Sequence, residues 1–388
     1  MRKVNLPHLP DWQEPAKRET IELELRLITP MFGGGYKARE VDPLQPIRPA
    51  AIRGHLRFWW RATAGARYAS VADLHKAETE LWGGASTKDN PAFGKVAIRV
   101  EVKDKGQMVG YGSRGGLPKY FLFPFRPQKN IPATKGRENV VFTLRLILDT
   151  SLSEAQRAEV TTALKAWIAF GGVGARTRRG CGALTVVGAN ANQWLPPTQG
   201  LAEWLEMPRD AASDHDWTTL AGARGFITLT KNAEDAWCKL GSFWERFRRG
   251  GLVSGTKWSD YRDVLCNLDD QHDELALAKP FLGLPIVYQK FGKQTPFTGT
   301  LEPAESGRMA SPVILKPIAL QGGKFGALVL VMHAPKPDKI RVNSEEYALA
   351  APTKDPVLQA LGAADVLDAV LKGARKHFTG KQTAQFRL

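Results

Sequence analysis

Residues 138–187 read ENVVFTLRLILDT (138–150), SLSEAQRAEVTTALKAWIAF (151–170), GGVGARTRRGCG (171–182) and ALTVV (183–187). The first piece is rich in branched and aromatic apolar residues and predicts a β-strand. Ser153 is a good helix N-cap, and the residues that follow it predict an α-helix. A glycine-rich segment then leads into a short strand. Its five glycines around three arginines indicate a backbone that turns sharply or lies close to an anion.

The residues before this stretch predict further strands and helices, and these give the order of elements in the first half. TIELELRL (20–27) alternates as a strand does, a helix is expected over about 50–64, and a second over 71–81. GKVAIRVEVK (94–103) predicts another strand. Residues 104–138 predict a long loop that contains one short strand around the apolar KYFLFPF (119–125). The first half therefore has the order strand, helix, strand, strand, helix, strand, which is the split βαβ order of ferredoxin-like domains.

The second half is less regular and shows no internal repeat by residue identity. Strands are expected at RGFITLTK (224–231), FLGLPIVY (281–288), SPVILKPIAL (311–320) and GALVLVMH (326–333), and helices at 233–248 and 355–376. Residues 190–208 interrupt the pattern and are the expected junction. We therefore expect an α+β protein with one domain at 1–190 and an irregular α+β domain at 191–388.

The charge of the chain limits the classes of partner. The 388 residues include 54 Lys and Arg against 39 Asp and Glu, a net charge of +15. This excess suits a polyanion such as a nucleic acid. Three dispersed cysteines form no CxxC pair, so structural zinc and a disulfide framework are not expected, and a reducing cytoplasm fits. The polar, proline-containing start is not a signal peptide, and no apolar run reaches membrane-spanning length.

Arginine recurs along the predicted helix at 50–64. Arg53, Arg57 and Arg61 form a stripe beside the apolar face, and two helical turns cover about 12 Å, enough to follow successive phosphates. The stripe has no acidic residue at i±3 or i±4 in its own helix. The alternative interpretation is an ordinary helix face whose acidic partners lie elsewhere in the fold.

The glycine segment fits neither common nucleotide motif. A P-loop needs GxxxxGK[ST] between a strand and a helix, and a Rossmann turn opens a helix, whereas this segment follows one. Its pattern is G-h-G-x5-G-h-G, where h is apolar. A loop of this kind can offer N–H groups and arginines to a phosphate without reading a base. The alternative is a helix C-cap followed by a tight connection.

The combination of motifs resembles the RAMP superfamily, the RNA-binding proteins of CRISPR systems. The similarity rests on TPMFGGG (29–35), PIRPAAIRGHLRFWWRA (46–62), LWGG (81–84) and GGVGARTRRGCGAL (171–184), and more loosely on FLGLPIVY and RMASPVILKPI (308–318). Within the superfamily it is most similar to the first subunits of the type III-B (Cmr) effector complex. The resemblance covers about residues 20–187 strongly and 280–320 weakly.

This resemblance implies two ferredoxin-like, RRM-related domains packed together, in a non-catalytic cytoplasmic subunit of an antiviral ribonucleoprotein. The implied partners are the 3′ region of the guide RNA, the target single-stranded RNA, and the backbone and capping RAMP subunits. No cofactor, metal or membrane is implied. With the charged residues after TPMFGGG, the expected RNA-binding residues are Lys37, Arg39, Arg48, Arg53, Arg57, Arg61, Gly172, Gly174, Arg176, Arg178, Arg179, Gly180 and Gly182.

One alternative is enzymatic. Some RAMP relatives cleave precursor guide RNA with a histidine as general acid or base, and His55 lies on the arginine-bearing helix. Its place on the helical wheel, near the tryptophan edge, suits a half-buried structural histidine. No second general acid or base accompanies it in the sequence. A peripheral membrane protein is the third class, but no clean basic amphipathic helix supports it. Binding without catalysis is the favoured interpretation.

Overall fold

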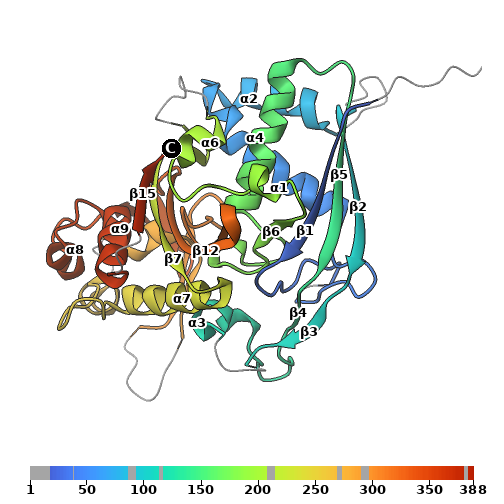
Figure 1. Ribbon diagram of the computed structural model, residues 1–388. Coiled ribbons are helices and arrows are strands. Elements are labelled where there is room, and N and C mark those ends of the chain that lie inside the picture. The colour runs from blue at the N-terminus through green and yellow to red at the C-terminus, as the bar shows by residue number, and fades with distance from the viewer. Residues whose placement is uncertain are drawn as a thin grey trace, which may run out of the picture.

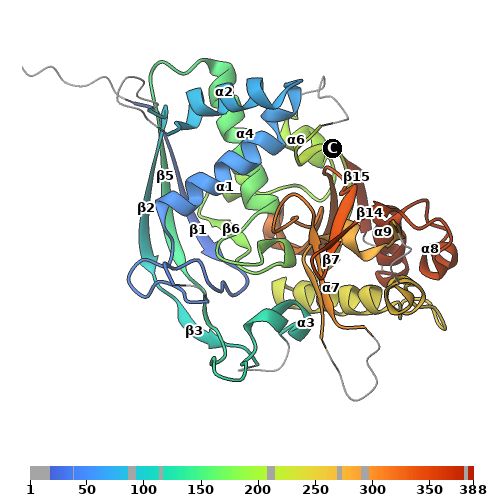
Figure 2. The same ribbon diagram turned by 180° about the vertical axis from the view of Figure 1, so that it is seen from behind.

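Two four-stranded antiparallel sheets, with a layer of helices between them, form the centre of the protein (Figures 1 and 2). The computed structural model describes residues 18–37, 39–85, 93–112, 117–207, 215–268, 273–289, 297–379 and 383–388. Among these residues, a five-stranded sheet and a two-stranded ladder complete the β-structure. The protein is therefore mixed α+β, as expected.

The first sheet has the order β2-β5-β1-β6, and every neighbouring pair is antiparallel. Its strands are β1 (Thr20–Leu27), β2 (Val96–Asp104), β5 (Val141–Leu148) and β6 (Leu184–Val187). The alternation expected in β1 is confirmed, because Leu23, Leu25 and Leu27 are buried and the residues between them are exposed. Helices α1 (Pro49–Ala62), α2 (Val71–Trp82) and α4 (Glu154–Phe170) lie at the expected places.

Helix α4 lies between the two sheets (Figure 1). Ser153 accepts from the backbone of Gln156 and the Gln156 side chain accepts in return, so both parts of a capping box are present. From Glu159 to Phe170 almost every side chain is buried, because one sheet covers each side of the helix. The glycine segment begins where this helix ends, so α4 fixes its position in the core.

The second sheet has the order β11-β12-β7-β15. Its strands are β7 (Thr219–Thr230), β11 (Val313–Leu320), β12 (Lys324–His333) and β15 (Thr383–Arg387). Helices α7 (Ala233–Arg249) and α9 (Val366–His377) pack on the face away from α4 (Figure 1). The strands of each sheet can be numbered one to four along their own half of the chain. Both sheets then have the order 2-3-1-4. The two halves therefore repeat one topology, although residue identity shows no repeat.

A smaller mixed sheet is inserted in the second half, in the order β8-β14-β13-β10-β9. Its strands are β8 (Glu274–Ala276), β9 (Ile286–Tyr288), β10 (Gly299–Pro303), β13 (Lys339–Val342) and β14 (Glu345–Ala350). The second half also contains the short helices α5 (Ala191–Trp194), α6 (Leu201–Leu205) and α8 (Pro356–Leu361).

Three expectations about secondary structure are wrong. KYFLFPF is not a strand but helix α3 (Lys119–Leu122) and a 3₁₀ turn, η2 (Phe123–Phe125), flanked by the ladder of β3 (Gln107–Gly110) and β4 (Lys135–Glu138). Pro118 and Pro124 start these turns, and proline favours the first turn of a helix. In FLGLPIVY only the last three residues are a strand. The helix expected over 355–376 is two helices, which Gly362 separates in the left-handed conformation.

The expected domain boundary at 190/191 stays a prediction. Most of the junction, residues 190–207, is described, and Trp194, Leu195, Leu201 and Leu205 within it are buried. The hydrophobic core is continuous across both halves: Ile314 and Leu328 of the second sheet share a cluster with Leu25 of the first. None of the described helices is long and apolar enough to span a membrane.

Candidate nucleic-acid interface

A groove of about 780 Å³ opens where four distant parts of the chain meet. They are the α3–η2 segment, the 3₁₀ turn η3 (Thr177–Arg179) of the glycine segment, the C-terminal end of α7, and the residues around β9 together with 309–311. Helix α3 lies beside α7 in both views (Figures 1 and 2). The groove is therefore a product of the tertiary fold.

Five arginines line this groove, and no carboxylate does so among the described residues: Arg176, Arg178, Arg179, Arg248 and Arg249. Three of them were expected from the glycine segment. The other two, Arg248 and Arg249, were missed, although the basic run RFRRG (246–250) ends a predicted helix. Cations in a last helical turn are usual for electrostatic reasons alone, so that signal was weak. Arg249 also pairs with Glu245 at 3.1 Å.

Arg179 is buried, with 9% of its surface exposed, so little of its side chain can be offered to a phosphate. Its guanidinium donates to the carbonyl of Val313 at 2.6 Å and to Oγ of Ser311 at 2.9 Å. It also lies over the ring of Trp244, 4.6 Å from the centroid. This side chain ties the glycine segment to the start of β11, which is a structural role.

The groove concentrates positive charge, and none of its described lining residues carries a carboxylate. Burial, and after it the charges of Arg176, Arg248 and Arg178, hold the pKa of Arg179 well below its ordinary value. Burial lowers the pKa of Arg178 to about 10, and its guanidinium lies over the Phe58 ring and donates to the carbonyl of Ser311. A guanidinium is protonated at neutral pH even so. An anion in the groove would stabilise all of these charges.

Arg176 differs from its two neighbours because it is exposed. Its backbone is left-handed, with φ +59°, at the start of η3. Among the described residues, neither its side chain nor that of Arg248 has an ion pair or a side-chain hydrogen bond. These two guanidiniums are therefore the ones best placed to contact a ligand.

The glycines of the segment allow other parts of the same chain to lie close to its backbone. A Cβ on Gly182, at φ +62°, would lie 2.0 Å from the carbonyl oxygen of Val173. A Cβ on Gly172 would meet the carbonyl oxygen of Gly182 at 2.7 Å, and one on Gly174 that of Phe32 at 2.8 Å. A Cβ on Gly180 would meet Trp237 of α7 and Pro317 of β11, both at 2.8 Å. Internal packing thus accounts for these glycines, and their approach to RNA stays a prediction.

The arginine stripe of α1 has partners on another helix. Arg57 and Arg61 both bond to Oε1 of Glu78 on α2, at 2.6 and 2.5 Å, and the Glu78 side chain is 4% exposed. Arg53 donates to the carbonyl of Trp82 at 2.9 Å. This supports the alternative of acidic partners elsewhere in the fold for Arg57 and Arg61. Two cations on one carboxylate leave one positive charge, so RNA contact by the stripe stays a prediction.

The other expected basic residues, Arg48, Arg39 and Lys37, lie in three different surroundings. Arg48 precedes α1 and lines a small pocket of about 70 Å³, together with Gly34, Gly174 and His55. The buried Nε of Arg48 has no hydrogen-bond partner in the described residues. Arg39 donates to the carbonyls of Pro124, Arg126 and Pro132. Lys37 is exposed, 5.7 Å from the ring centroid of Tyr36.

His55 has the half-buried position expected of a structural histidine. Its ring stacks on that of Trp167, with centroids 6.3 Å apart, and burial lowers its pKa. A neutral imidazole is therefore favoured at pH 7. In the part of the chain that the structure describes, no three His, Cys, Asp or Glu residues gather as metal ligands would.

Lys316 of β11 holds the end of α4 from the opposite sheet. It is fully buried, and its Nζ donates to the carbonyl of Gly171 at 2.8 Å and that of Ile168 at 3.2 Å. These carbonyls belong to the C-terminal end of α4, where a cation is favoured. Burial acts in the other direction and lowers the pKa of Lys316 to about 7. The start of the glycine segment therefore depends on a lysine of the second half.

We expect the pH dependence of the free energy of unfolding to reflect the lowered pKa of Lys316. The unfolded chain keeps the lysine proton up to about pH 10, whereas the folded state releases it from about pH 7, so the free energy of unfolding contributed by Lys316 rises between these values. Urea unfolding of wild type and Lys316→Met at pH 7, 8.5 and 10 measures the difference. The free energy of unfolding of wild type minus that of Lys316→Met should increase as the pH rises. A difference independent of pH would contradict this assignment.

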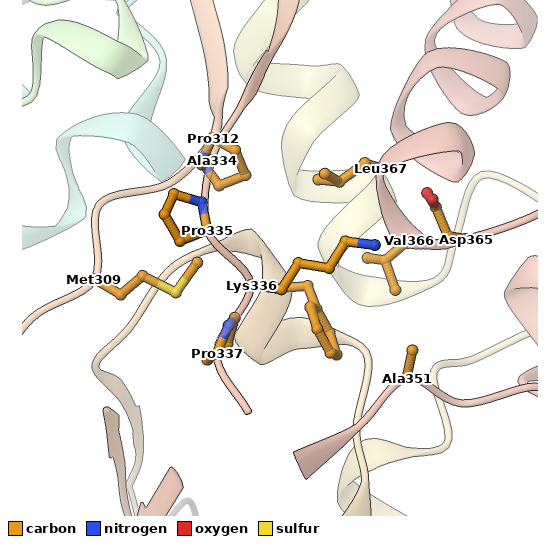
Figure 3. Close-up of a pocket in the computed structure, with 11 residues that line it drawn as sticks. Met309, Pro312, Ala334, Pro335, Lys336, Pro337, Ala351, Asp365, Val366 and Leu367 are labelled. Atoms are coloured by element: carbon orange, nitrogen blue, oxygen red, sulfur yellow. The ribbon is translucent and has the colours of Figure 1, made fainter. Parts of the chain in front are cut away.

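Met309 lines the groove and also a second pocket, which Figure 3 shows. Its walls are mostly apolar and include Phe281, Pro312 and Pro335, and its volume is about 40 Å³. Ligand pockets usually measure several hundred Å³. The pocket is thus too small for a nucleotide, and the arginine-lined groove is the candidate interface.

Comparisons with known proteins give the family and the fold that this chain resembles. Residues 24–185 match the family model of the RAMP superfamily. The chain is 28% identical over 182 residues to the CRISPR system Cmr subunit Cmr1-2 of Pyrococcus furiosus, covering 42% of this chain and 92% of that protein.

Solved structures share the fold along nearly the whole chain. The crystal structure of apo Cmr1 from Pyrococcus furiosus has a TM-score of 0.58 at 16% identity and covers 95% of this chain and 98% of that one. A chain of the type III-B Cmr-beta complex bound to cognate target RNA, solved by cryo-EM, has a TM-score of 0.52 at 13% identity, with 93% and 99% covered. At these identities the likeness concerns the fold.

Proposed function

We propose that this chain is an RNA-binding subunit of a type III-B CRISPR effector complex, since residues 24–185 match the family model of the RAMP superfamily. The observation that carries the proposal is the groove with five arginines and no carboxylate among its described lining residues. Such a lining binds a phosphate backbone and makes no demand on the base sequence.

The proposal includes the finer fold. Each half of the chain contributes four strands in the order second, third, first, fourth with antiparallel neighbours, and two helices that pack on the resulting sheet. This arrangement fits two ferredoxin-like domains. The groove then lies between them, with the glycine segment from the first and α7 and β9 from the second.

The proposed ligands are single strands of RNA. One of the solved relatives belongs to a complex with cognate target RNA, and the resemblance of the motifs points to the 3′ region of the guide as well. The other RAMP subunits of the effector would be the protein partners, in the cytoplasm. The subunit would bind RNA without cleaving it, since the His55 ring is half-buried against Trp167 and no metal-ligand cluster lies among the described residues.

One experiment tests both binding and the absence of cleavage. Purified protein is mixed with labelled guide-repeat RNA over a range of salt concentrations, with and without a divalent metal. We expect binding that weakens steeply with salt and depends little on sequence, and RNA that stays intact. Affinity independent of salt would contradict the proposal. Site-specific cleavage that is lost in His55→Ala would instead favour the alternative, a metal-independent endoribonuclease that processes precursor guide RNA.

A further inference from the structure

Phe123 places an exposed aromatic ring at the edge of the basic groove. The residue is 44% exposed and lines the groove that also contains Arg176 and Arg178. A large aromatic side chain is usually well buried in a folded protein. Trp244 also lines the groove but is 4% exposed and carries Arg179 over its ring. Phe123 is therefore the more accessible of these two aromatic surfaces.

One face of the Phe123 ring is already covered. The guanidinium carbon of Arg126 lies 3.8 Å from the ring centroid, which is a close cation–π contact. The exposed surface of the ring must then belong to its other face and edge. Arg126 both limits the orientations of the ring and adds a positive charge behind it.

The segment around Phe123 is held rigidly. Phe123 opens the 3₁₀ turn η2, and Phe125 at its end is buried and stacks on Phe32, with centroids 4.7 Å apart and an angle of 17°. Arg39 donates to the carbonyls of Pro124 at 2.8 Å and Arg126 at 3.0 Å. Arg39, which was expected to bind RNA, therefore acts here as a positioning residue for the turn.

We propose that Phe123 is a stacking platform for an unpaired nucleobase of the RNA strand whose phosphates contact the groove arginines. The inference rests on the proposed function and names the part of the ligand that the groove would hold in addition to phosphate. A nucleic-acid strand carries flat aromatic bases beside its phosphates, so it matches an open ring face next to clustered arginines. Stacking is tolerant of sequence, because every base has a π-face.

Two probes separate stacking from phosphate binding. They are an oligoadenylate of about 12 nucleotides and a ribose–phosphate strand of the same length without bases. Phe123→Ala should weaken binding of the oligoadenylate about tenfold, because one stacked base is lost. It should leave binding of the abasic strand within about twofold, because the phosphate contacts stay. Phe123→Trp should retain wild-type affinity for the oligoadenylate.

Ile131→Ala is the matched control. Ile131 is 45% exposed, follows Phe123 by eight residues in the chain and does not line the groove, so its removal should change neither affinity. Equal losses on both probes, or no loss on the oligoadenylate, would overturn the stacking role while wild-type binding still supported the proposed function. The second of these results would point to a protein partner for the ring. Wild-type protein that binds neither probe would overturn the proposed function and the stacking role together.

Discussion

Replacement of Arg176 and Arg248 with alanine in one variant should weaken single-stranded RNA binding by about 100-fold at low salt, if each guanidinium contacts one phosphate. Both line the groove, and neither has an ion pair among the described residues. The slope of log affinity against log salt should fall by about 1.4, because each lost phosphate contact in a single strand removes about 0.7. The melting temperature should change little. Filter binding across a salt series measures the affinity and the slope together.

The matched control removes the same charge from another surface. Arg26 of β1 and Arg99 of β2 are exposed on the first sheet and do not line the groove. Arg26→Ala with Arg99→Ala should reduce affinity only slightly, through the lower net charge. Equal losses in the two double variants would mean that RNA responds to overall charge and not to the groove.

Gly182→Ala should lower the free energy of unfolding by more than about 4 kcal/mol or prevent the protein from accumulating in soluble form. The new Cβ would lie 2.0 Å from the carbonyl oxygen of Val173, and backbone atoms on both sides would have to move. Those atoms are held in place, since Val173 donates to the carbonyl of Gly182 and Gly182 to that of Pro30. Urea unfolding or, for an insoluble variant, the soluble fraction measures the effect.

Gly362→Ala separates this clash from the cost of a left-handed backbone. Gly362 has φ +59°, against +62° for Gly182, but a Cβ there would have no neighbour within 4 Å. Its replacement should cost about 1–2 kcal/mol. Equal effects of the two substitutions would show that Gly182 is required by its backbone conformation and not by the close approach of Val173.

The sequence was most informative where periodicity and capping act locally. The strands β1, β2 and β5 and the helices α1, α2 and α4 lie within a few residues of their expected ranges, because alternation, helical spacing and the Ser153 capping box are properties of neighbouring residues. KYFLFPF was misassigned because the local pattern alone does not decide its structure. Its apolar run fits a strand or a buried helical turn equally well, and the packing of Phe125 on Phe32 occurs only in the folded chain.

By itself, the sequence determined the α+β class, the order of elements in the first half, the excess of positive charge and the glycine segment as a place of sharp turns or close approach beside three arginines. The tertiary structure decided which arginines are available. Glu78, 17 residues from Arg61, pairs with two arginines of the α1 stripe, and Arg179 bonds to residues more than 130 positions away. Arg248 joins Arg176 only because α7 packs beside the glycine segment. Periodicity shows which face of a helix a charge occupies, but its partner depends on which faces meet when the two halves pack.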